Sequence, residues 1–368
     1  MMTNLFFDHN ATTPIRPNAL ALAASVMGEV GNAASVHSFG RAANKHVETA
    51  RRQIAEILDV SPQQIIFNSG ASEGNNTILK GFSGQRILIS AIEHPSIIEC
   101  GVAAEKIPVT EDGVIDVVAF QDLLNHPTPP ALVSVMLVNN ETGVIQPVAE
   151  IARMAKAVGA MVHCDAVQAY GRIPFTRESL GVDFLTISSH KIGGTHGVGA
   201  LIGAAGLQVP RLIEGGGQER RQRGGTVNVA GISAFGVAAV EACASLDSYQ
   251  NLSVWRDRIE LHVQQSSNRV RILGQHSPRV ANTSMIVVTS ASSETLLMAF
   301  DLEGIALSAG SACSSGSTKM SYTLTAMGIE PSPQLASLRM SLGYTTSEKD
   351  VEHFIKVWDK LSARLFKD

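Results

Sequence analysis

Residues 184–203 read FLTISSHKIGGTHGVGALIG, an apolar run followed by two serines, His190, Lys191 and a glycine-rich segment. An apolar run of this length, bounded by polar residues and glycine, is typical of a strand buried on both faces of a parallel sheet. The glycines after Lys191 allow the backbone to approach another group closely. The stretch therefore predicts a buried strand whose end carries a polar, close-packed turn.

The same pattern recurs in the first two thirds of the chain. Short apolar runs at 65–67, 86–90, 131–138 and 161–166 alternate with segments of helical periodicity at 74–82 and 148–159, after an amphipathic helix expected over 38–60. Alternating strands and helices favour a three-layer α/β domain with its site at the carboxyl ends of the strands. After about residue 240 comes a long helical stretch, followed by short strands and helices, which predicts a second, smaller α/β domain.

Composition limits the class of partner. The chain has 368 residues, 45% of them hydrophobic, and a formal net charge of -4 without long runs of one sign, so nucleic acid and anionic membranes are poor candidates and a small molecule is favoured. The four cysteines form no CxxC pair, which fits a reducing cytosol, and no stretch has the length of a membrane span. We expect a cytoplasmic protein without a metal site.

Two polar residues follow apolar runs, Lys191 and the Asp165 of HCDAVQAYG (163–171). A carboxylate at the end of a buried strand needs a cationic or hydrogen-bonding partner to stay ionised. Pyridoxal phosphate uses both residue types, since a lysine holds it as a Schiff base and an acidic side chain pairs with its pyridine nitrogen. Taken singly, Lys191 is equally well explained as a surface lysine and Asp165 as a helix cap, but together they favour a cofactor site.

Three further segments fit such a site less specifically. FNSGASEGNN (67–76) has a strand, a turn and a helix start, so Ala71 and Ser72 are placed to bind a phosphate, although Ser72 with Glu73 also reads as an ordinary cap. His94 follows a strand and could stack on a flat ring or simply cap a helix. The basic loop 214–226 is either solvated or an anion-contacting loop at a subunit or cofactor boundary.

Cys313 lies in SAGSACSSGS (308–317), among serine, alanine and glycine rather than the apolar neighbours of a structural cysteine. Cys100, Cys164 and Cys243 have apolar or helical surroundings and are expected in the core. Cys313 alone is a candidate reactive thiol, against the alternative of a chance free thiol in a loop.

At this level the chain resembles the NifS-like and IscS-like cysteine desulfurases of the class V aminotransferases. The resemblance runs nearly end to end and rests on these ordered motifs: DHNATTP (8–14), GNAASVHSFGR (31–41), SGASEGNN (69–76), EHPS (93–96), VNNETG (138–143), DAVQ (165–168), SSHKIGG (188–194), GGGQER to GGT (215–226), GSACSSGS (310–317) and SLRMSLG (337–343).

The resemblance implies the type I fold of pyridoxal-phosphate enzymes. We expect a large domain over 15–240, with a central, mostly parallel seven-stranded sheet flanked by helices, and a smaller α/β domain formed by 1–14 and 241–368. The length of 308–322 matches the group of desulfurases with a long mobile loop. The resemblance also implies a homodimer.

The resemblance further implies a role for each matching residue. Lys191 would hold the cofactor and Asp165 would pair with its pyridine nitrogen, while Gln168 would bind its phenolic oxygen and His94 would stack on its ring and handle protons. Cys313 would attack the substrate sulfur as a thiolate. The implied phosphate ligands are Ala71, Ser72, Ser188 and His190, with Thr226 of the other subunit, and the implied ligands of the substrate carboxylate are Asn140 and Arg339.

The chain departs from the family pattern at a few positions. Ser72 replaces a threonine, Gly74 a serine and Arg221 a glycine, while Thr195 and His196 replace a proline and a lysine. None of these changes removes a chemical group that the reaction needs.

The expected activity is conversion of L-cysteine to L-alanine, with the sulfur passed through a Cys313 persulfide to an acceptor protein, either an iron–sulfur scaffold or a carrier for other thio-cofactors or tRNA thiolation. Any contact of Cys313 with an iron–sulfur cluster would be transient and through that partner. The alternatives are a selenocysteine lyase or aminotransferase of the same fold, or a non-catalytic sulfur-carrier subunit.

Overall fold

The computed structural model describes residues 4–289, 291–309, 321–330 and 332–366. Cys313 therefore lies outside the described residues. The larger of the two main sheets has seven strands in the order β2-β8-β7-β6-β5-β3-β4, and only β8 is antiparallel to its neighbours. Its strands are β2 Ile65–Asn68, β3 Ile87–Ser90, β4 Glu105–Ile107, β5 Leu132–Ser134, β6 Met161–Asp165, β7 Phe184–Ser188 and β8 Gly199–Gly203.

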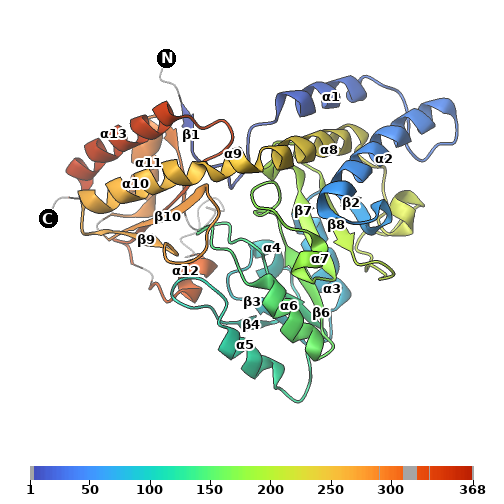
Figure 1. The fold of residues 1–368 in the computed structure, drawn as a ribbon, viewed down its shortest axis with the longest axis horizontal. Helices are drawn as coiled ribbons and strands as arrows, with labels where there is room; N and C mark the ends of the chain where they lie inside the picture. The colour runs from blue at the N-terminus through green and yellow to red at the C-terminus, as the bar shows by residue number, and fades with distance from the viewer. Residues whose placement is uncertain (1–3, 290, 310–320, 331, 367–368) are drawn as a thin grey trace.

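Helices cover both faces of this sheet (Figure 1). Alternate residues of β3 enter different apolar clusters, Leu88 on one face and Ile87 and Ile89 on the other, as the two-residue period of a strand requires. The helices of the first 244 residues are α1 Pro17–Met27, α2 Ser38–Leu58, α3 Ala71–Gly81, α4 Pro95–Ile98, α5 Val117–Leu124, α6 Val148–Ala157, α7 Arg177–Leu180 and α8 Val229–Ala244.

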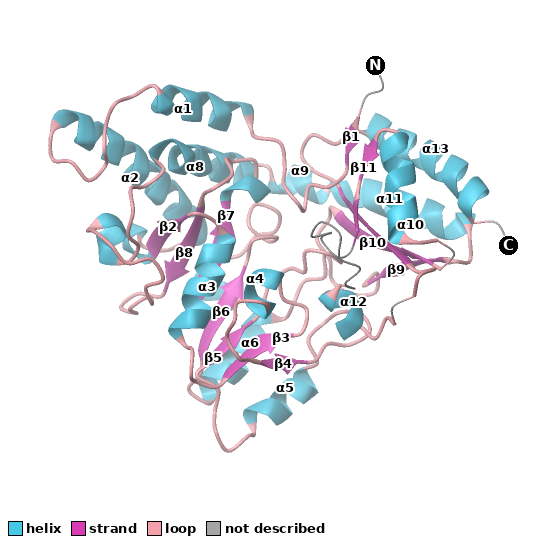
Figure 2. Ribbon diagram, turned by 180° about the vertical axis from the view of Figure 1, so that it is seen from behind, coloured by secondary structure: helices cyan, strands magenta, loops and turns pink. Residues whose placement is uncertain are grey.

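A smaller antiparallel sheet has the order β12-β13-β10-β9, and a short parallel pair joins β1 to β11 (Figure 2). The strands are β1 Leu5–Phe6, β9 Val270–Leu273, β10 Thr283–Val288, β11 Ile305–Ala306, β12 Ser308–Ala309 and β13 Ala336–Ser341. The helices here are α9 Leu246–Gln250, α10 Leu252–Ser266, α11 Ser293–Leu302, α12 Tyr322–Ala326 and α13 Glu348–Leu365.

The seven-stranded sheet and the smaller C-terminal sheet confirm the predicted fold class. Three details differ from the sequence analysis. The run 131–138 is a strand only over Leu132–Ser134, the glycine-rich segment after Lys191 contains the strand β8, and the long helical stretch after residue 240 is broken into α9 and α10. β8 was missed because glycine and alanine carry little strand signal.

The domain boundaries stay a proposal. A separate apolar cluster of the C-terminal part includes Phe7 from the N-terminus, which supports the assignment of 1–14 to the small domain. The proposed boundary at residue 240 falls inside α8. Among the described residues no single helix has the length and apolar character of a membrane span, and α8 with residues 246–266 reaches them only as a pair bent by 66°.

The loop between β8 and α8 contains three consecutive left-handed residues that are not glycine: Glu219, Arg220 and Arg221. Glu219 is buried and accepts two hydrogen bonds from the guanidinium of Arg51, at 2.7 and 2.8 Å, so the middle of a largely exposed loop is anchored to the large domain. Arg223 likewise binds both carboxylate oxygens of Glu73. These contacts hold the backbone in a conformation that costs an L-residue about 1 kcal/mol or more at each position.

Arg221→Gly is expected to stabilise the protein by about 1 kcal/mol, because glycine adopts a φ of 65° without a steric penalty. The Arg221 side chain makes no hydrogen bond or ion pair within the described ranges, so little is lost with it. The measurement is the urea concentration at half-unfolding. Arg211→Gly is the control, since Arg211 is exposed and lies outside the left-handed set, and an equal gain in both variants would contradict the explanation.

Candidate active site

Four neighbouring strands deliver the predicted site residues to one edge of the large sheet. Asp165 is the last residue of β6, and Ser188 is the last residue of the adjacent β7, which continues into a 3-10 turn, Ser189–Lys191. His94 follows β3 and Asn140 follows β5. Because carboxyl ends of parallel strands meet at one edge, residues far apart in sequence come together here.

Lys191 is turned toward the N-terminal segment. Its Nζ donates to the carbonyl oxygens of Asn10 and Ala11, at 2.5 and 2.6 Å. Burial and the positive charges of Arg339 and Arg172 together lower the pKa of this amine from 10.5 to about 7, against the opposing charges of Asp8 and Asp165. A substantial fraction of Lys191 is therefore a neutral amine near pH 7, which can act as a nucleophile or a base. A surface lysine would lack this property.

Asp165 is buried, and each of its oxygens accepts a hydrogen bond. Oδ1 accepts from the backbone N–H of Val167 at 3.0 Å, and Oδ2 accepts from Nδ2 of Asn75 at 2.8 Å. Both oxygens of this buried carboxyl group therefore have a hydrogen-bond donor. Asp165 lies at a strand end and is not a helix cap.

The carboxyl group of Glu93 lies close to this aspartate. It is buried, and burial together with the charge of Asp165 raises its pKa well above the usual range. Burial and the neighbouring carboxylate thus both favour a proton on Glu93.

His94 both caps a helix and faces the site. Its Nδ1 accepts from the N–H of Ser96, which places the ring at the start of α4. Desolvation lowers the pKa of the ring, Asp165 opposes that change, and Lys191 and Arg339 lower the pKa further. The two explanations offered for His94 from the sequence are thus compatible, since one residue can cap α4 and lie among these charges.

Arg339 comes from β13 of the smaller sheet. Its guanidinium donates to Asp8 Oδ1 at 2.7 Å and to the backbone oxygen of Asn140 at 3.2 Å, whereas its buried Nε has no partner among the described residues. The neighbouring strand β12 pairs Ser308 with Arg339. The chain that leads to Cys313 therefore starts beside this arginine.

The start of α3 is a suitable place for an anion. The amides of Ala71 and Ser72 have no acceptor among the described residues, and Gly70 precedes them with a φ of 147°. Glycine at residue 199 leaves this turn open, because a Cβ there would lie 2.8 Å from Cα of Gly70. Ser72 is not the helix cap, which is Gly70, so the capping interpretation of Ser72 is wrong.

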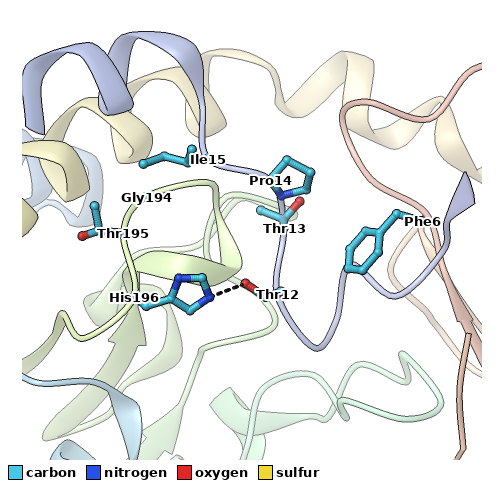
Figure 3. A pocket seen from close by; sticks show the side chains of 8 residues that line it. All are labelled: Phe6, Thr12, Thr13, Pro14, Ile15, Gly194, Thr195 and His196. Atoms are coloured by element: carbon cyan, nitrogen blue, oxygen red, sulfur yellow. Dashed lines mark hydrogen bonds between the residues drawn. The ribbon is translucent and has the colours of Figure 1, made fainter. Parts of the chain in front are cut away.

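His190 lies at the end of β7, next to His196. The hydroxyl of Thr12 bonds both rings, at 3.2 Å to Nδ1 of His190 and at 3.1 Å to Nε2 of His196. Figure 3 shows the second of these bonds. A cavity of about 380 Å³ opens between residues 12–15 and 194–196, with Phe6 at its edge. None of the predicted site residues lines this cavity.

Thr226 is exposed on the loop after Arg223. Cys100 and Cys164 are buried as expected, and Cys243 is half-buried. Burial raises the pKa of Cys243 to about 11, which makes it a poor nucleophile.

Sequence reasoning assigned no role to the N-terminal motif DHNATTP. Asp8 pairs with Arg339, and the backbone oxygen of Asn10 accepts from both Lys191 and Gln168. Asn75, which holds Asp165, was also missed. The motifs that contain these residues were visible, but only the folded chain shows what the side chains and carbonyl groups contact.

Comparisons with known proteins agree with this arrangement. The family model described as Aminotransferase class-V matches residues 5–354. A cysteine desulfurase from Sinorhizobium fredii is 37% identical over 97% of this chain and 96% of its own length, and the cysteine desulfurase IscS of Dictyoglomus turgidum is 34% identical over 99% and 96%. The structure of a NifS-like protein from Rickettsia africae superposes with a TM-score of 0.91 at 36% identity, covering 98% of this chain and 99% of that one.

Proposed function

Because this chain belongs to the class-V aminotransferase family and has cysteine desulfurases as full-length homologues, we propose that it is a pyridoxal-phosphate-dependent cysteine desulfurase. The reaction would convert L-cysteine to L-alanine and transfer the sulfur to Cys313. The observation that carries the proposal is that Lys191 and Asp165, at one edge of the large sheet, lie close to Arg339 of the smaller sheet. A structural neighbour, SspA, was solved in complex with cysteine, at 26% identity and a TM-score of 0.79.

The donor set suits pyridoxal phosphate. Lys191 supplies an amine of lowered pKa for the carbonyl carbon of the cofactor, and Asp165 supplies an anion for the pyridine nitrogen. Gln168 is buried with an unpartnered Oε1, as expected where a polar group of a ligand completes the bonding. The amides of Ala71 and Ser72 would bind the phosphate with Ser188 and His190.

When bound, the cofactor withdraws electrons from Cα of the substrate. Side chains of the protein would bind the substrate and remove its proton. Arg339 and Asn140 would hold the substrate carboxylate, for which a guanidinium fork is well shaped. The amine of Lys191, with its pKa of about 7, would remove the proton from Cα.

Sulfur transfer would require Cys313 as a thiolate. Its Sγ forms an S–S bond with the substrate sulfur while the bond between Cβ and that sulfur breaks. The electron pair of the broken bond stays on carbon and is protonated, which yields alanine and a persulfide on Cys313. No external oxidant is needed, because carbon gains the electrons that sulfur loses.

We also propose a homodimer. Large apolar side chains are exposed on α1, on α2 and on the segment between them, at the end of the large domain away from the small sheet (Figure 1), and Val36 and Met27 are 88% and 77% exposed. A dimer that buries this surface would also allow Thr226 to reach the phosphate of the other subunit. The sulfur acceptor, an iron–sulfur scaffold or another carrier, and a cytoplasmic location stay predictions.

The test is to incubate the purified, cofactor-loaded protein with L-cysteine and a reductant, and to measure alanine and sulfide together. The proposal expects the two products in equal amounts. Pyruvate or a keto acid instead of alanine would identify a different reaction on this fold. A protein that binds no pyridoxal phosphate and forms neither product would favour the sulfur-carrier alternative.

Arg339→Lys is expected to raise KM for cysteine roughly 10- to 100-fold, with a smaller change in kcat, because lysine keeps the charge but loses the two-pronged contact with a carboxylate. Steady-state alanine formation measures both constants. Arg271→Lys is the control, since Arg271 is exposed on β9 of the same sheet. An unchanged KM in Arg339→Lys would remove Arg339 from the substrate site.

A further inference from the structure

A chain of hydrogen bonds connects Asp165 to His94 through two residues that have no assigned role. Nδ2 of Asn75 donates to Oδ2 of Asp165 at 2.8 Å and to Oγ of Ser96 at 2.9 Å. Oγ of Ser96 lies 2.8 Å from Nδ1 of His94. Asn75 is fully buried, so this amide cannot exchange these partners for water.

The direction of every bond in this chain follows from the chemistry of its members. An ionised Asp165 only accepts, so the nitrogen end of the Asn75 amide must face it. Because that nitrogen also donates to Ser96, the hydroxyl hydrogen of Ser96 remains free to donate to Nδ1 of His94. The backbone N–H of Ser96 donates to the same atom at 3.1 Å, and an N–H can only donate.

Nδ1 of His94 therefore carries a lone pair, and the proton of the neutral ring is on Nε2. The surroundings favour the neutral ring: burial, Lys191 and Arg339 all lower its pKa, against the opposing effect of Asp165. The position of the ring at the start of α4 acts in the same direction, because a helix N-terminus disfavours a cation. His94 and Lys191 would then have different roles, a donor at Nε2 and a base at Nζ.

The neighbouring Asn76 shows that the hydrogen bonds from Asp165 to His94 are not needed simply to hold α4 in place. Nδ2 of Asn76 donates to the backbone oxygens of Ser72 and Ser96, at 3.0 and 2.9 Å, and so joins α3 to α4 independently. Both side-chain hydrogen bonds of Asn75 among the described residues go to side chains of the site.

We propose that Asn75 and Ser96 are positioning residues of the active site, which fix Asp165 in place and hold His94 as the neutral tautomer that donates from Nε2. The inference rests on the proposed desulfurase function for its kinetic consequences. The assignment of the tautomer does not depend on that function, since it follows from the protein contacts alone.

The first experiment measures the tautomer directly. Histidine labelled with 15N is incorporated into the full chain without cofactor, and the His94 signals are identified by their absence in His94→Gln. A proton on Nε2 and a bare Nδ1 in the wild type are expected. Ser96→Ala should shift the ring toward a mixture of tautomers, and Ser96→Thr, which keeps the hydroxyl, should restore the wild-type spectrum. A proton on Nδ1 in the wild type would overturn the proposal.

The second experiment measures alanine formation by the cofactor-loaded enzyme. Asn75→Ala is expected to lower kcat roughly 10- to 100-fold, the effect of losing a hydrogen bond to a charged group, with KM changed less than about threefold because Asn75 does not contact Arg339. Ser96→Ala should lower kcat in the same direction and Ser96→Thr should recover it. Asn76→Ala is the matched control and should keep the wild-type kcat.

The outcomes separate this proposal from the proposed function. A wild-type enzyme that forms no alanine from cysteine contradicts the function, while the 15N spectrum still decides the tautomer. An active wild type in which Ser96→Ala and Asn76→Ala have the same kcat overturns the positioning role. If Asn75→Ala does not fold, the measurements on the wild type, Ser96→Ala and Ser96→Thr decide the question alone.

Discussion

Lys191→Ala should lower alanine and sulfide formation from cysteine by at least about a thousandfold, because it removes both the proposed attachment point of the cofactor and the proposed general base, and a base alone contributes roughly 10²- to 10⁴-fold. The lowered pKa of Lys191, about 7, is what suits it for both tasks. The other lysines among the described residues are exposed, so none is placed to replace it.

The measurement has a part that does not depend on activity. Borohydride reduction of the loaded wild type should fix the cofactor covalently to the peptide that contains Lys191, as read by mass spectrometry. The same treatment of Lys191→Ala should leave the chain unmodified. Lys356→Ala, an exposed change on α13, is the control for both readouts. Cofactor fixed to another lysine, or activity within tenfold of the wild type, would contradict the assignment.

The parts of the fold that could be predicted from the sequence are those with strong apolar periodicity. The helix expected over 38–60 is α2, Ser38–Leu58, because residues such as Val47 and Ile54 repeat at helical spacing and are buried. β6 and β7 were visible as apolar runs. The strand β8 was not, since the glycines at both ends of GALIG favour a turn in sequence, although Leu201 and Ile202 are buried in the core.

Some features of the candidate site could likewise be predicted from the sequence, and others could not. The ends of β6 and β7 could be located because a charged residue after a buried strand is conspicuous in sequence. The positions of Asp165 and Lys191 near each other needed the sheet order, which follows from long-range pairing and not from local pattern. The ion pair of Asp8 with Arg339 spans 331 residues, and no periodicity could reveal it.

The left-handed residues are another feature that could not be predicted from the sequence. The sequence shows that Arg221 replaces a glycine of the family pattern, but it does not show that Glu219 and Arg220 also have positive φ. That conformation is imposed by contacts with Arg51 and Glu73, which belong to other elements. Local propensity predicts neither the strain nor what balances it.

Cys313→Ala should lower sulfide release by at least about a hundredfold, because sulfur transfer needs a thiolate nucleophile and no second cysteine is suited to the task. Burial raises the pKa of Cys164 well above its usual value and that of Cys243 to about 11. Cys100 is buried in an apolar cluster. These contexts favour the proposed role of the fourth cysteine, Cys313, which lies outside the described residues.

Chain geometry supports the same choice. Ser308 of β12 is paired with Arg339, the proposed ligand of the substrate carboxylate. Cys313 follows Ala309 by four residues, and four residues of chain span at most about 14 Å. A thiol at this position is thus tethered within reach of a substrate held by Arg339, whereas Cys243 is on α8 and packs against the core of the large domain.

The assay should separate the two chemical stages. In Cys313→Ala, exchange of the Cα proton of cysteine with heavy water should continue, because it depends on Lys191, while sulfide, alanine and a persulfide detectable by mass spectrometry should be lost. Cys243→Ala is the matched control and should retain all of them. Wild-type sulfide release by Cys313→Ala would remove this residue as the nucleophile and favour a lyase or aminotransferase reaction, in which the ring chemistry needs no cysteine of the protein.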